Sequence, residues 1–180
     1  IILGAKVREG CSIGPVCRVG GEVEESIIHG YSNKYHDGFL GHAYVCEWVN
    51  LGALTTNSDL KNDYSTVQVV VKGELMDTGE TKVGSFIGDH VKTSIGTLLN
   101  TGTVVGTMSI LMATAGVLPK YIPPFTWYLE GKRTKGFGLK ALLQTARVAM
   151  NRRKVELTAE EEELLKYCFD LTKEERMKYI

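Results

Sequence analysis

A six-residue phrase constrains this sequence more than any other feature. Between Ile87 and Gly116 it occurs five times in succession. An aliphatic or β-branched residue opens each phrase and a small residue follows four positions later: Ile87 and Val91, Thr93 and Thr97, Leu99 and Thr103, Val105 and Ser109, Leu111 and Ala115. Because six is not a multiple of 3.6, this spacing cannot hold one face of a helix, but it suits short strands separated by turns. Units this short bury their apolar side only by stacking on neighbours, so the repeat predicts a solenoid of parallel strands.

The same phrase opens the chain and is then interrupted twice. Its opening positions recur at Ile1, Val7, Ile13 and Val19, and again at Val45 and Leu51. Only parts of it persist over residues 26–40, which hold two histidines and two tyrosines. It is lost over residues 57–82, where we expect an insertion with a strand and a hairpin turn near Met76 to Glu80. An insertion in a solenoid usually leaves the coil as a loop, and loops commonly carry function.

The phrase resembles the hexapeptide repeat of left-handed parallel β-helix acyltransferases, in which an aliphatic residue, often followed by Gly, precedes a small residue. The resemblance implies left-handed winding with about three phrases per turn. Periodicity alone does not, because crossover connections are usually right-handed. The expected fold class is therefore mainly β: a left-handed parallel β-helix over residues 1–118, with the insertion near 57–82. Proteins of this fold also serve as carbonic anhydrases and as regulatory or trimerising modules, so the fold leaves the function open.

Residues 119–180 are expected to form an extended linker and a helical tail. Pro119, Pro123 and Pro124 argue against continued strand or helix. Apolar residues then recur at helical spacing, at Leu139, Leu142, Leu143, Ala146 and Met150. A second helix is predicted to begin at Thr158, because Thr158 and Glu161 form a capping-box pattern. We expect the helices to cover the last coil, whose exposed backbone edge would otherwise pair with further strands.

Charge and composition exclude several classes of function. Basic and acidic residues number 21 each, so no overall attraction to nucleic acid or membrane is implied. Most of the positive excess lies over residues 119–154, with nine basic residues against Glu130 alone. There is neither a secretory signal nor an apolar run long enough to span a bilayer, so we expect a cytoplasmic protein. The chain begins within a repeat and without an initiating Met, which suggests a piece of a longer protein.

The segment from His36 to Asn57, HDGFLGHAYVCEWVNLGALTTN, carries the strongest functional signal. It resembles the acetyltransferase half of the bifunctional enzymes that make UDP-N-acetylglucosamine. The matching residues are His36, Leu40, Gly41, Asn50, Gly52, Ala53 and Asn57. The whole chain looks still more like the C-terminal part of a bacterial group of sugar-nucleotidyltransferase-like proteins. A nucleotidyltransferase domain would then lie upstream of Ile1.

This resemblance implies transfer of an acyl group from acetyl-CoA to an amino sugar phosphate or a nucleotide sugar. His36 would be the general base, since a neutral imidazole with a pKa of about 6.5 can accept a proton at cellular pH. The expected substrate ligands are Lys34, Tyr35, Asn50, Asn57 and Lys61. The expected ligands of the coenzyme phosphates, by charge-assisted contacts, are Lys120, Lys132, Arg133 and Lys135. Ser58 departs from the family pattern, in which Tyr follows the Asn, so the acceptor is left open.

Two alternatives remain open at this point. A catalytically silent domain that trimerises or regulates a nucleotidyltransferase would explain the repeat and the tail equally well. A zinc site like that of trimeric carbonic anhydrases is weaker, because their histidine pair is five residues apart, whereas His29, His36 and His42 are spaced by seven and six. We therefore expect no metal. The three classes share one expectation, a homotrimer formed through apolar residues on the solenoid faces: Phe39, Tyr44, Trp48 and Leu98.

Overall fold

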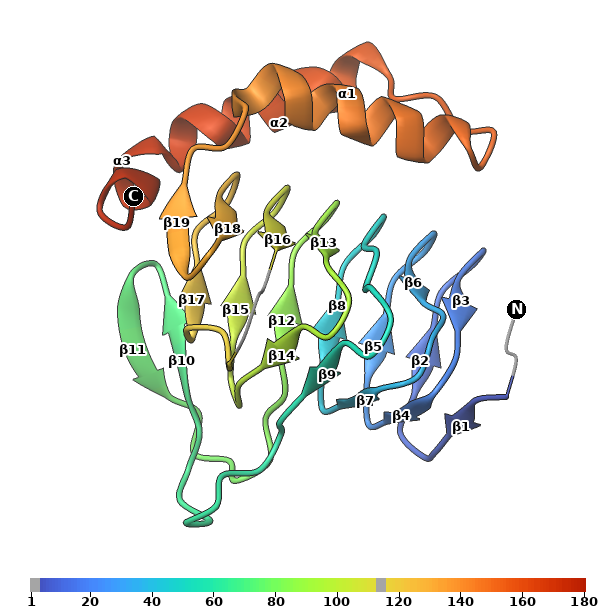
Figure 1. Ribbon diagram of the computed structural model, residues 1–180, viewed down its shortest axis with the longest axis vertical. Helices are drawn as coiled ribbons and strands as arrows, with labels where there is room; N and C mark the ends of the chain where they lie inside the picture. The colour runs from blue at the N-terminus through green and yellow to red at the C-terminus, as the bar shows by residue number, and fades with distance from the viewer. Residues whose placement is uncertain (1–3, 113–115) are drawn as a thin grey trace.

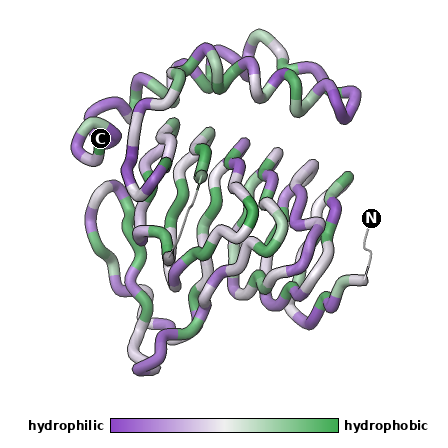
Figure 2. Tube along the Cα trace, in the orientation of Figure 1, coloured by the Kyte–Doolittle hydropathy of each residue, from purple (hydrophilic) through white to green (hydrophobic). Residues whose placement is uncertain are grey.

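The residues that open successive phrases stack on one another inside a parallel β-solenoid of about seven turns (Figure 1). The computed structural model describes residues 4–112 and 116–180. Ile1 and Ala115 lie outside these residues. On one face the inward stack is continuous, and neighbouring members are paired in register: Ile13, Ile28, Val45, Ile87, Val105 and Ile122. In Figure 2 hydrophobic segments recur from coil to coil. The expected parallel β-helix of hexapeptide repeats is confirmed.

Each coil contributes short strands to three faces. The first face is a six-stranded parallel sheet of β2 (Ser12–Ile13), β5 (Ile27–Ile28), β8 (Tyr44–Val45), β12 (Phe86–Ile87), β15 (Val104–Val105) and β17 (Tyr121–Ile122). The second face holds β3 (Arg18–Val19), β6 (Asn33–Lys34), β13 (Lys92–Thr93), β16 (Ile110–Met112), β18 (Trp127–Leu129) and β19 (Lys132–Thr134). The third holds β1 (Lys6–Val7), β4 (Glu22–Glu24), β7 (Phe39–Gly41), β9 (Thr56–Asn57) and β14 (Leu98–Leu99). On the second face, Asn50 bridges Asn33 and Lys92.

One corner of the solenoid is a ridge of residues with left-handed backbone conformation. They have φ between 57° and 62° and occupy the same place in successive coils: Val16, Tyr31, Trp48, His90, Met108 and Phe125. After the first, each backbone N–H donates to a carbonyl of the preceding coil. Such a conformation costs a non-glycine residue about 1–2 kcal/mol. Packing offsets this cost at Met108 and Phe125, which contact Leu142, Leu143 and Ala146 of the first helix.

The solenoid extends beyond the expected boundary at residue 118. β17 pairs in parallel with β15, and β18 pairs in parallel with β16, so residues 121–129 form a further coil instead of an extended linker. The expectation from the prolines was wrong because Pro123 and Pro124 lie at a corner between two strands. There the missing N–H breaks no ladder bond, while the Pro123 carbonyl still accepts from Ser109 Oγ at 2.9 Å.

The insertion contains an antiparallel hairpin of β10 (Gln68–Val71) and β11 (Glu74–Asp77). Its turn lies at Lys72 and Gly73, both with positive φ, and not near Met76 to Glu80 as expected. A two-residue loop with two positive φ values matches the twist of the flanking strands. The hairpin is held to the solenoid by Val67, Val69 and Val83, which pack against Val104.

The first of the three tail helices lies along the ridge (Figure 1), whereas residues of the second and third contact the last coil: Phe169 packs edge-on against Phe125, and the Tyr121 hydroxyl donates to Glu175 at 2.6 Å. The three helices are α1 (Gly138–Asn151), α2 (Ala159–Leu171) and α3 (Lys173–Met177). The capping box at Thr158 and Glu161 is confirmed, with both reciprocal hydrogen bonds present. The outer edge of β18 is covered by β19, which pairs with it antiparallel. Among the described residues, no helix has the length and apolarity needed to cross a membrane.

Candidate functional site

His36 lies on the corner between β6 and β7, with its side chain exposed to solvent. Its ring packs edge-on against Tyr35, with 5.4 Å between ring centroids. The backbone of this corner is held by both neighbouring coils. Glu22 N–H donates to the Gly38 carbonyl at 3.1 Å, and Leu54 N–H donates to the Asp37 carbonyl at 2.9 Å. The histidine is therefore presented to solvent from a fixed backbone.

Gly20 of the preceding coil makes this corner possible. A Cβ at Gly20 would lie 2.0 Å from the Tyr35 carbonyl oxygen, so any side chain there would displace the loop that carries His36. The repeat alone gave no sign of this requirement, because glycine is common next to the aliphatic position of a phrase.

Lys34 is buried inside the coil. It stacks on Val19, and its Nζ donates to the carbonyls of Gly20 at 3.0 Å and His36 at 2.7 Å. Burial lowers the pKa of Lys34 to about 8, and nearby Asp37 acts in the opposite direction. Because the Lys34 ammonium already donates to two carbonyls, we no longer expect it to contact the substrate. Lys34 instead holds the backbone of the corner that carries His36.

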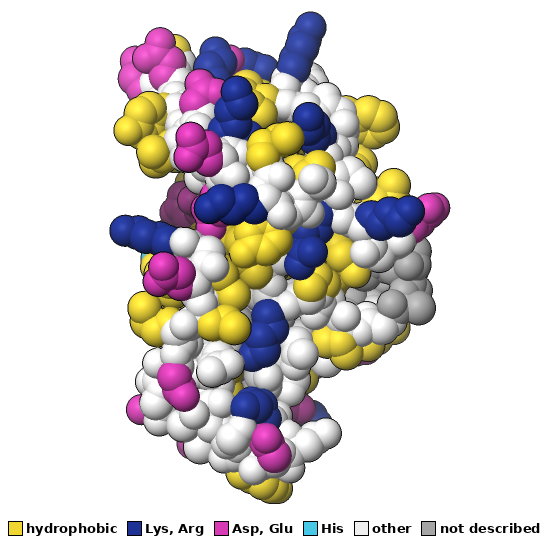
Figure 3. All heavy atoms as spheres, turned by 90° about the vertical axis from the view of Figure 1, so that its left-hand side faces the viewer, with side chains coloured by type: hydrophobic (Ala, Val, Ile, Leu, Met, Phe, Trp, Pro, Cys, Tyr) yellow, Lys and Arg dark blue, Asp and Glu magenta, His cyan; other side chains and the backbone are white. Residues whose placement is uncertain are grey.

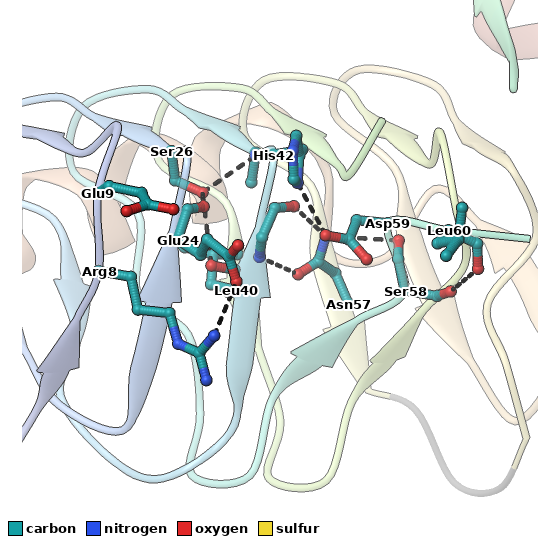
Figure 4. Close-up of polar contacts among 12 residues, drawn as sticks. Arg8, Glu9, Glu24, Ser26, Leu40, His42, Asn57, Ser58, Asp59 and Leu60 are labelled. Atoms are coloured by element: carbon teal, nitrogen blue, oxygen red, sulfur yellow. Dashed lines mark hydrogen bonds and ion pairs between the residues drawn. The ribbon is translucent and has the colours of Figure 1, made fainter. Parts of the chain in front are cut away.

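Asn57 is also directed inward and serves the backbone. Its Oδ1 accepts from Gly41 N–H and its Nδ2 donates to the Gly41 carbonyl, both at 2.8 Å (Figure 4). The side-chain amide thereby replaces the two strand-to-strand bonds that neighbouring coils would otherwise make. Asn57 thereby links β9 to β7, and its role in this geometry is structural.

The structure also reveals a histidine–carboxylate pair that the sequence reasoning missed. His42 Nδ1 lies 2.8 Å from Asp59 Oδ2, and the two side chains are 21% and 16% exposed (Figure 4). If the bonded Nδ1 carries the proton, Nε2 is left as an acceptor. The departure from the family pattern after Asn57 was the available signal, because it places Asp59 within reach of His42.

The remaining expected ligands of the substrate fall in different places. Lys61 and Asn57 line one cavity of about 460 Å³, together with Leu98 and Val117. Lys61 Nζ donates to the Thr66 carbonyl at 3.0 Å and also contacts Ser65. Asn50 lies elsewhere, in a groove beneath α1. The structure thus brings Lys34, Tyr35 and His36 together on one corner, and the other expected ligands do not join them.

The expected ligands of the coenzyme lie near the C-terminal end of the solenoid. Figure 3 looks onto this end, where Lys and Arg side chains are spread between hydrophobic ones. Arg133 donates two hydrogen bonds to the Tyr121 carbonyl, and Lys120 Nζ donates to the Gln68 carbonyl at 2.9 Å. Lys132 and Lys135 are exposed. The two lysines remain free for a phosphate, whereas Arg133 and Lys120 already bind backbone.

Within residues 4–112 and 116–180 there is no group of three or more His, Cys, Asp and Glu that could hold a metal ion. Two histidine rings have hydrogen-bond partners among the described residues: His29 contacts the Tyr44 hydroxyl at 2.7 Å and His42 contacts Asp59.

The fold and its repeat define a class, the parallel β-helices built from hexapeptide repeats. No family model matches the chain. It is 39% identical over 85 residues to the bifunctional sugar-1-phosphate nucleotidylyltransferase/acetyltransferase of Sulfurisphaera tokodaii, a match that covers 47% of this chain and 21% of that protein. It is 26% identical over 151 residues to the bifunctional protein GlmU of Gloeothece citriformis, covering 75% of this chain and 29% of GlmU. The resemblance to bifunctional proteins of this kind is confirmed.

The chain spans less than a third of the length of these relatives. Among solved structures, the polysialic acid O-acetyltransferase OatWY aligns with a TM-score of 0.31 and 14% identity, over 72% of this chain and 75% of that one. A similarity at this level carries no argument about function.

Proposed function

We propose that this chain is the acyltransferase part of a sugar-nucleotidyltransferase-like protein, and that it transfers an acetyl group from acetyl-CoA to the amine of an amino sugar phosphate or nucleotide sugar. The observation that carries the proposal is the 85-residue match, at 39% identity, to a protein named for both activities. The cytoplasmic location and the upstream nucleotidyltransferase domain remain predictions that follow from the same relationship.

In this proposal His36 is the general base. Its neutral imidazole removes a proton from the acceptor amine, and the amine nitrogen attacks the thioester carbonyl carbon. A C–N bond forms, the C–S bond breaks, and the coenzyme leaves as the thiol after receiving the proton. A backbone N–H near the corner would stabilise the oxyanion. What supports this role is the exposure of the ring on a backbone that Lys34 and two neighbouring coils hold in place.

The proposal is tested with the wild-type chain, acetyl-CoA and glucosamine 1-phosphate, by following release of free thiol. We expect turnover, and we expect His36→Ala to lower kcat by roughly 10²-fold or more, since a general base contributes about 10²–10⁴-fold. Acetyl-CoA affinity should be unchanged, because the substitution removes only proton transfer. An unchanged kcat in His36→Ala would refute the assignment of the base.

A silent trimerising module is the second candidate. The observation in its favour is that Lys34 and Asn57, both expected to bind substrate, are occupied by backbone groups inside the coil. Absence of turnover by the wild-type chain on every amino sugar phosphate and nucleotide sugar tried would favour this candidate over the enzyme.

The trimer itself is proposed through the six-stranded face. Its outward row contains Ile27, Tyr44 and Phe86, which are paired in register and remain about 40% exposed at 43%, 39% and 38%. Trp48, which we expected on this surface, is 8% exposed and stacks on Tyr31, so it is not available to a partner. A flat apolar row of this kind suits a closed cyclic assembly.

A further inference from the structure

A groove of about 410 Å³ lies between the second half of α1 and the solenoid. Its floor is formed by Arg18, Asn33, Asn50 and Lys92, the outward residues of one face, and by the ridge residues Tyr31 and Trp48. Its roof is formed by α1 and the residues after it: Gln144, Thr145, Val148, Ala149, Arg152 and Arg153. His36 and the other corner residues do not line it, so the groove is separate from the proposed acyltransferase site.

The groove gathers positive charge without a compensating carboxylate. Its lining holds Arg18, Lys92, Arg152 and Arg153 but no Asp or Glu. None of these four side chains makes an ion pair with a described residue. Burial first, and then the proximity of Arg18 and Arg152, lowers the pKa of Arg153. Like charges held close together without a counter-ion destabilise the free protein, and an anion would relieve this repulsion.

The polar groups of the groove are arranged as donors. Arg153 Nη2 donates to Asn33 Oδ1 at 2.7 Å, and Asn33 Nδ2 donates to Asn50 Oδ1 at 3.0 Å. This relay occupies both amide oxygens and leaves the Asn50 amide N–H groups available. Lys92 is held beside them, since its Nζ donates to the carbonyls of Trp48 and His90 at 2.7 and 2.9 Å. Guanidinium and amide donors converging on one space match the oxygens of a phosphate group.

The size of the groove and its apolar side indicate a ligand that is larger than a single phosphate ion. Val148 and Ala149 of α1 and the aromatic pair Tyr31–Trp48 complete the lining. The two rings are stacked with their centroids 4.2 Å apart, and His90 stacks on the far side of Trp48 at 6.2 Å. Ring edges and aliphatic groups beside a cationic cluster suit a ligand with a phosphate head and a less polar remainder.

We infer that the groove between α1 and the solenoid is a binding site for a phosphorylated small molecule, whose phosphate groups are held by Arg18, Arg152 and Arg153. Arg153 also ties the end of α1 to the first coils through the Val16 carbonyl and Asn33. A bound phosphate would therefore link the helix to the N-terminal coils. The inference does not depend on acyl transfer.

The test is isothermal titration of the full chain with three probes: inorganic pyrophosphate, ADP and glucose 1-phosphate. The variant is Arg18→Ala/Arg152→Ala, in which neither changed side chain has a described hydrogen-bond partner, and Arg153 is kept. The matched control is Lys140→Ala, which removes one exposed charge from α1 outside the groove. Circular dichroism of each variant verifies the fold, and crystals grown with the tightest probe locate it independently of the variants.

We expect at least one probe to bind the wild type and the control equally, and to bind the double variant roughly tenfold more weakly or worse, because charged hydrogen bonds are lost. The ranking of the probes then identifies the source of the phosphate: ADP first indicates a nucleotide, and glucose 1-phosphate first indicates a sugar phosphate. Failure of all three probes to bind at millimolar concentration would overturn the inference. So would binding that the double variant leaves unchanged, or a probe located elsewhere in the crystal.

Discussion

His42 Nδ1 lies 2.8 Å from the carboxylate of Asp59, a residue 17 positions further along the chain. The pair forms because His42 directly follows β7 and Asp59 lies just after β9, and Asn57 links those two strands through both of its amide atoms. A Cβ at Gly41, between them, would lie 2.6 Å from Asp59 Oδ2. The contact is therefore a product of how two coils pack.

The first prediction separates His36, which precedes β7, from His42, which follows it. With His36 as the base, His42→Ala should keep kcat within about twofold and instead lower the free energy of unfolding by about 1–3 kcal/mol, because Asp59 loses its partner. Asp59→Asn, which keeps the shape, should behave in the same way. Urea unfolding and the thiol-release assay measure the two effects. A loss of kcat in both variants as large as that in His36→Ala would transfer the role of base to His42.

The second prediction concerns Lys34 and Lys92, whose side chains are both withdrawn from water. Burial lowers the pKa of both Lys34 and Lys92 to about 8. An unfolded lysine keeps its proton up to a pH of about 10.4, so between these values the unfolded state binds more protons and stability rises with pH. We expect the free energy of unfolding to increase from pH 8 to about pH 9.5, below the usual tyrosine pKa of about 10.

Lys34→Met/Lys92→Met should lose this increase, because neither side chain titrates. Lys140→Met, at an exposed position, is the matched control and should retain it. Urea titrations at the two pH values provide the comparison. A slope that is the same in the double variant and in the wild type would show that other groups produce it.

The third prediction is a loss of stability in acid that originates at His90. Burial first, and then the charge of Lys92, lowers the pKa of His90 to about 3. Between pH values of about 6.5 and 3, His90 is protonated in the unfolded state but not in the folded state. The free energy of unfolding therefore falls as the pH decreases from about 6.5 toward 3. His90→Met should reduce that fall, since Met108 occupies the equivalent ridge position with the same backbone conformation. Thermal unfolding at pH 7 and pH 4.5 tests it, and equal shifts in both proteins would contradict it.

The fourth prediction concerns the outward row of the six-stranded face. Light scattering of the wild type at micromolar concentration should give the mass of a trimer. Phe86→Glu should give a monomer, because a charge on the face would be buried without a partner. Tyr64→Glu is the control, since Tyr64 is 71% exposed and lies in the insertion. A wild type that elutes as a monomer would remove the basis of this prediction.

The fifth prediction concerns the coenzyme. Lys132 and Lys135 are exposed, whereas Arg133 is engaged with the Tyr121 carbonyl. Lys132→Ala/Lys135→Ala should raise the Kd of acetyl-CoA roughly tenfold at low salt if these lysines contact its phosphates. Lys6→Ala, at the other end of the solenoid, should leave the Kd unchanged. Equal Kd values for all three proteins at low salt would show that the coenzyme binds elsewhere.

The repeat was enough to predict the solenoid, because the burial of aliphatic side chains that it requires is met between neighbouring coils. Each phrase places an aliphatic residue where the next coil places another, as Ile87 does against Val45 and Val105, and only stacked parallel strands bury them all. The capping box at Thr158 is a local pattern. The prediction from the prolines was wrong because a proline is incompatible with a strand only at positions where a backbone N–H must donate a hydrogen bond. Whether a position lies in a strand or at a corner depends on the neighbouring coil.

Which polar side chains point outward, and which are used inside the coil, depends on contacts between distant parts of the chain. The pattern of the corner around His36 does not reveal that Lys34 points into the coil, or that Asn57 is used by Gly41. It also does not reveal that α1 returns along the ridge and brings Arg152 and Arg153 over Arg18. The direction of these side chains follows from the separation of adjacent coils and from the packing of a helix on them. Those distances join residues far apart in the chain, and no short phrase encodes them.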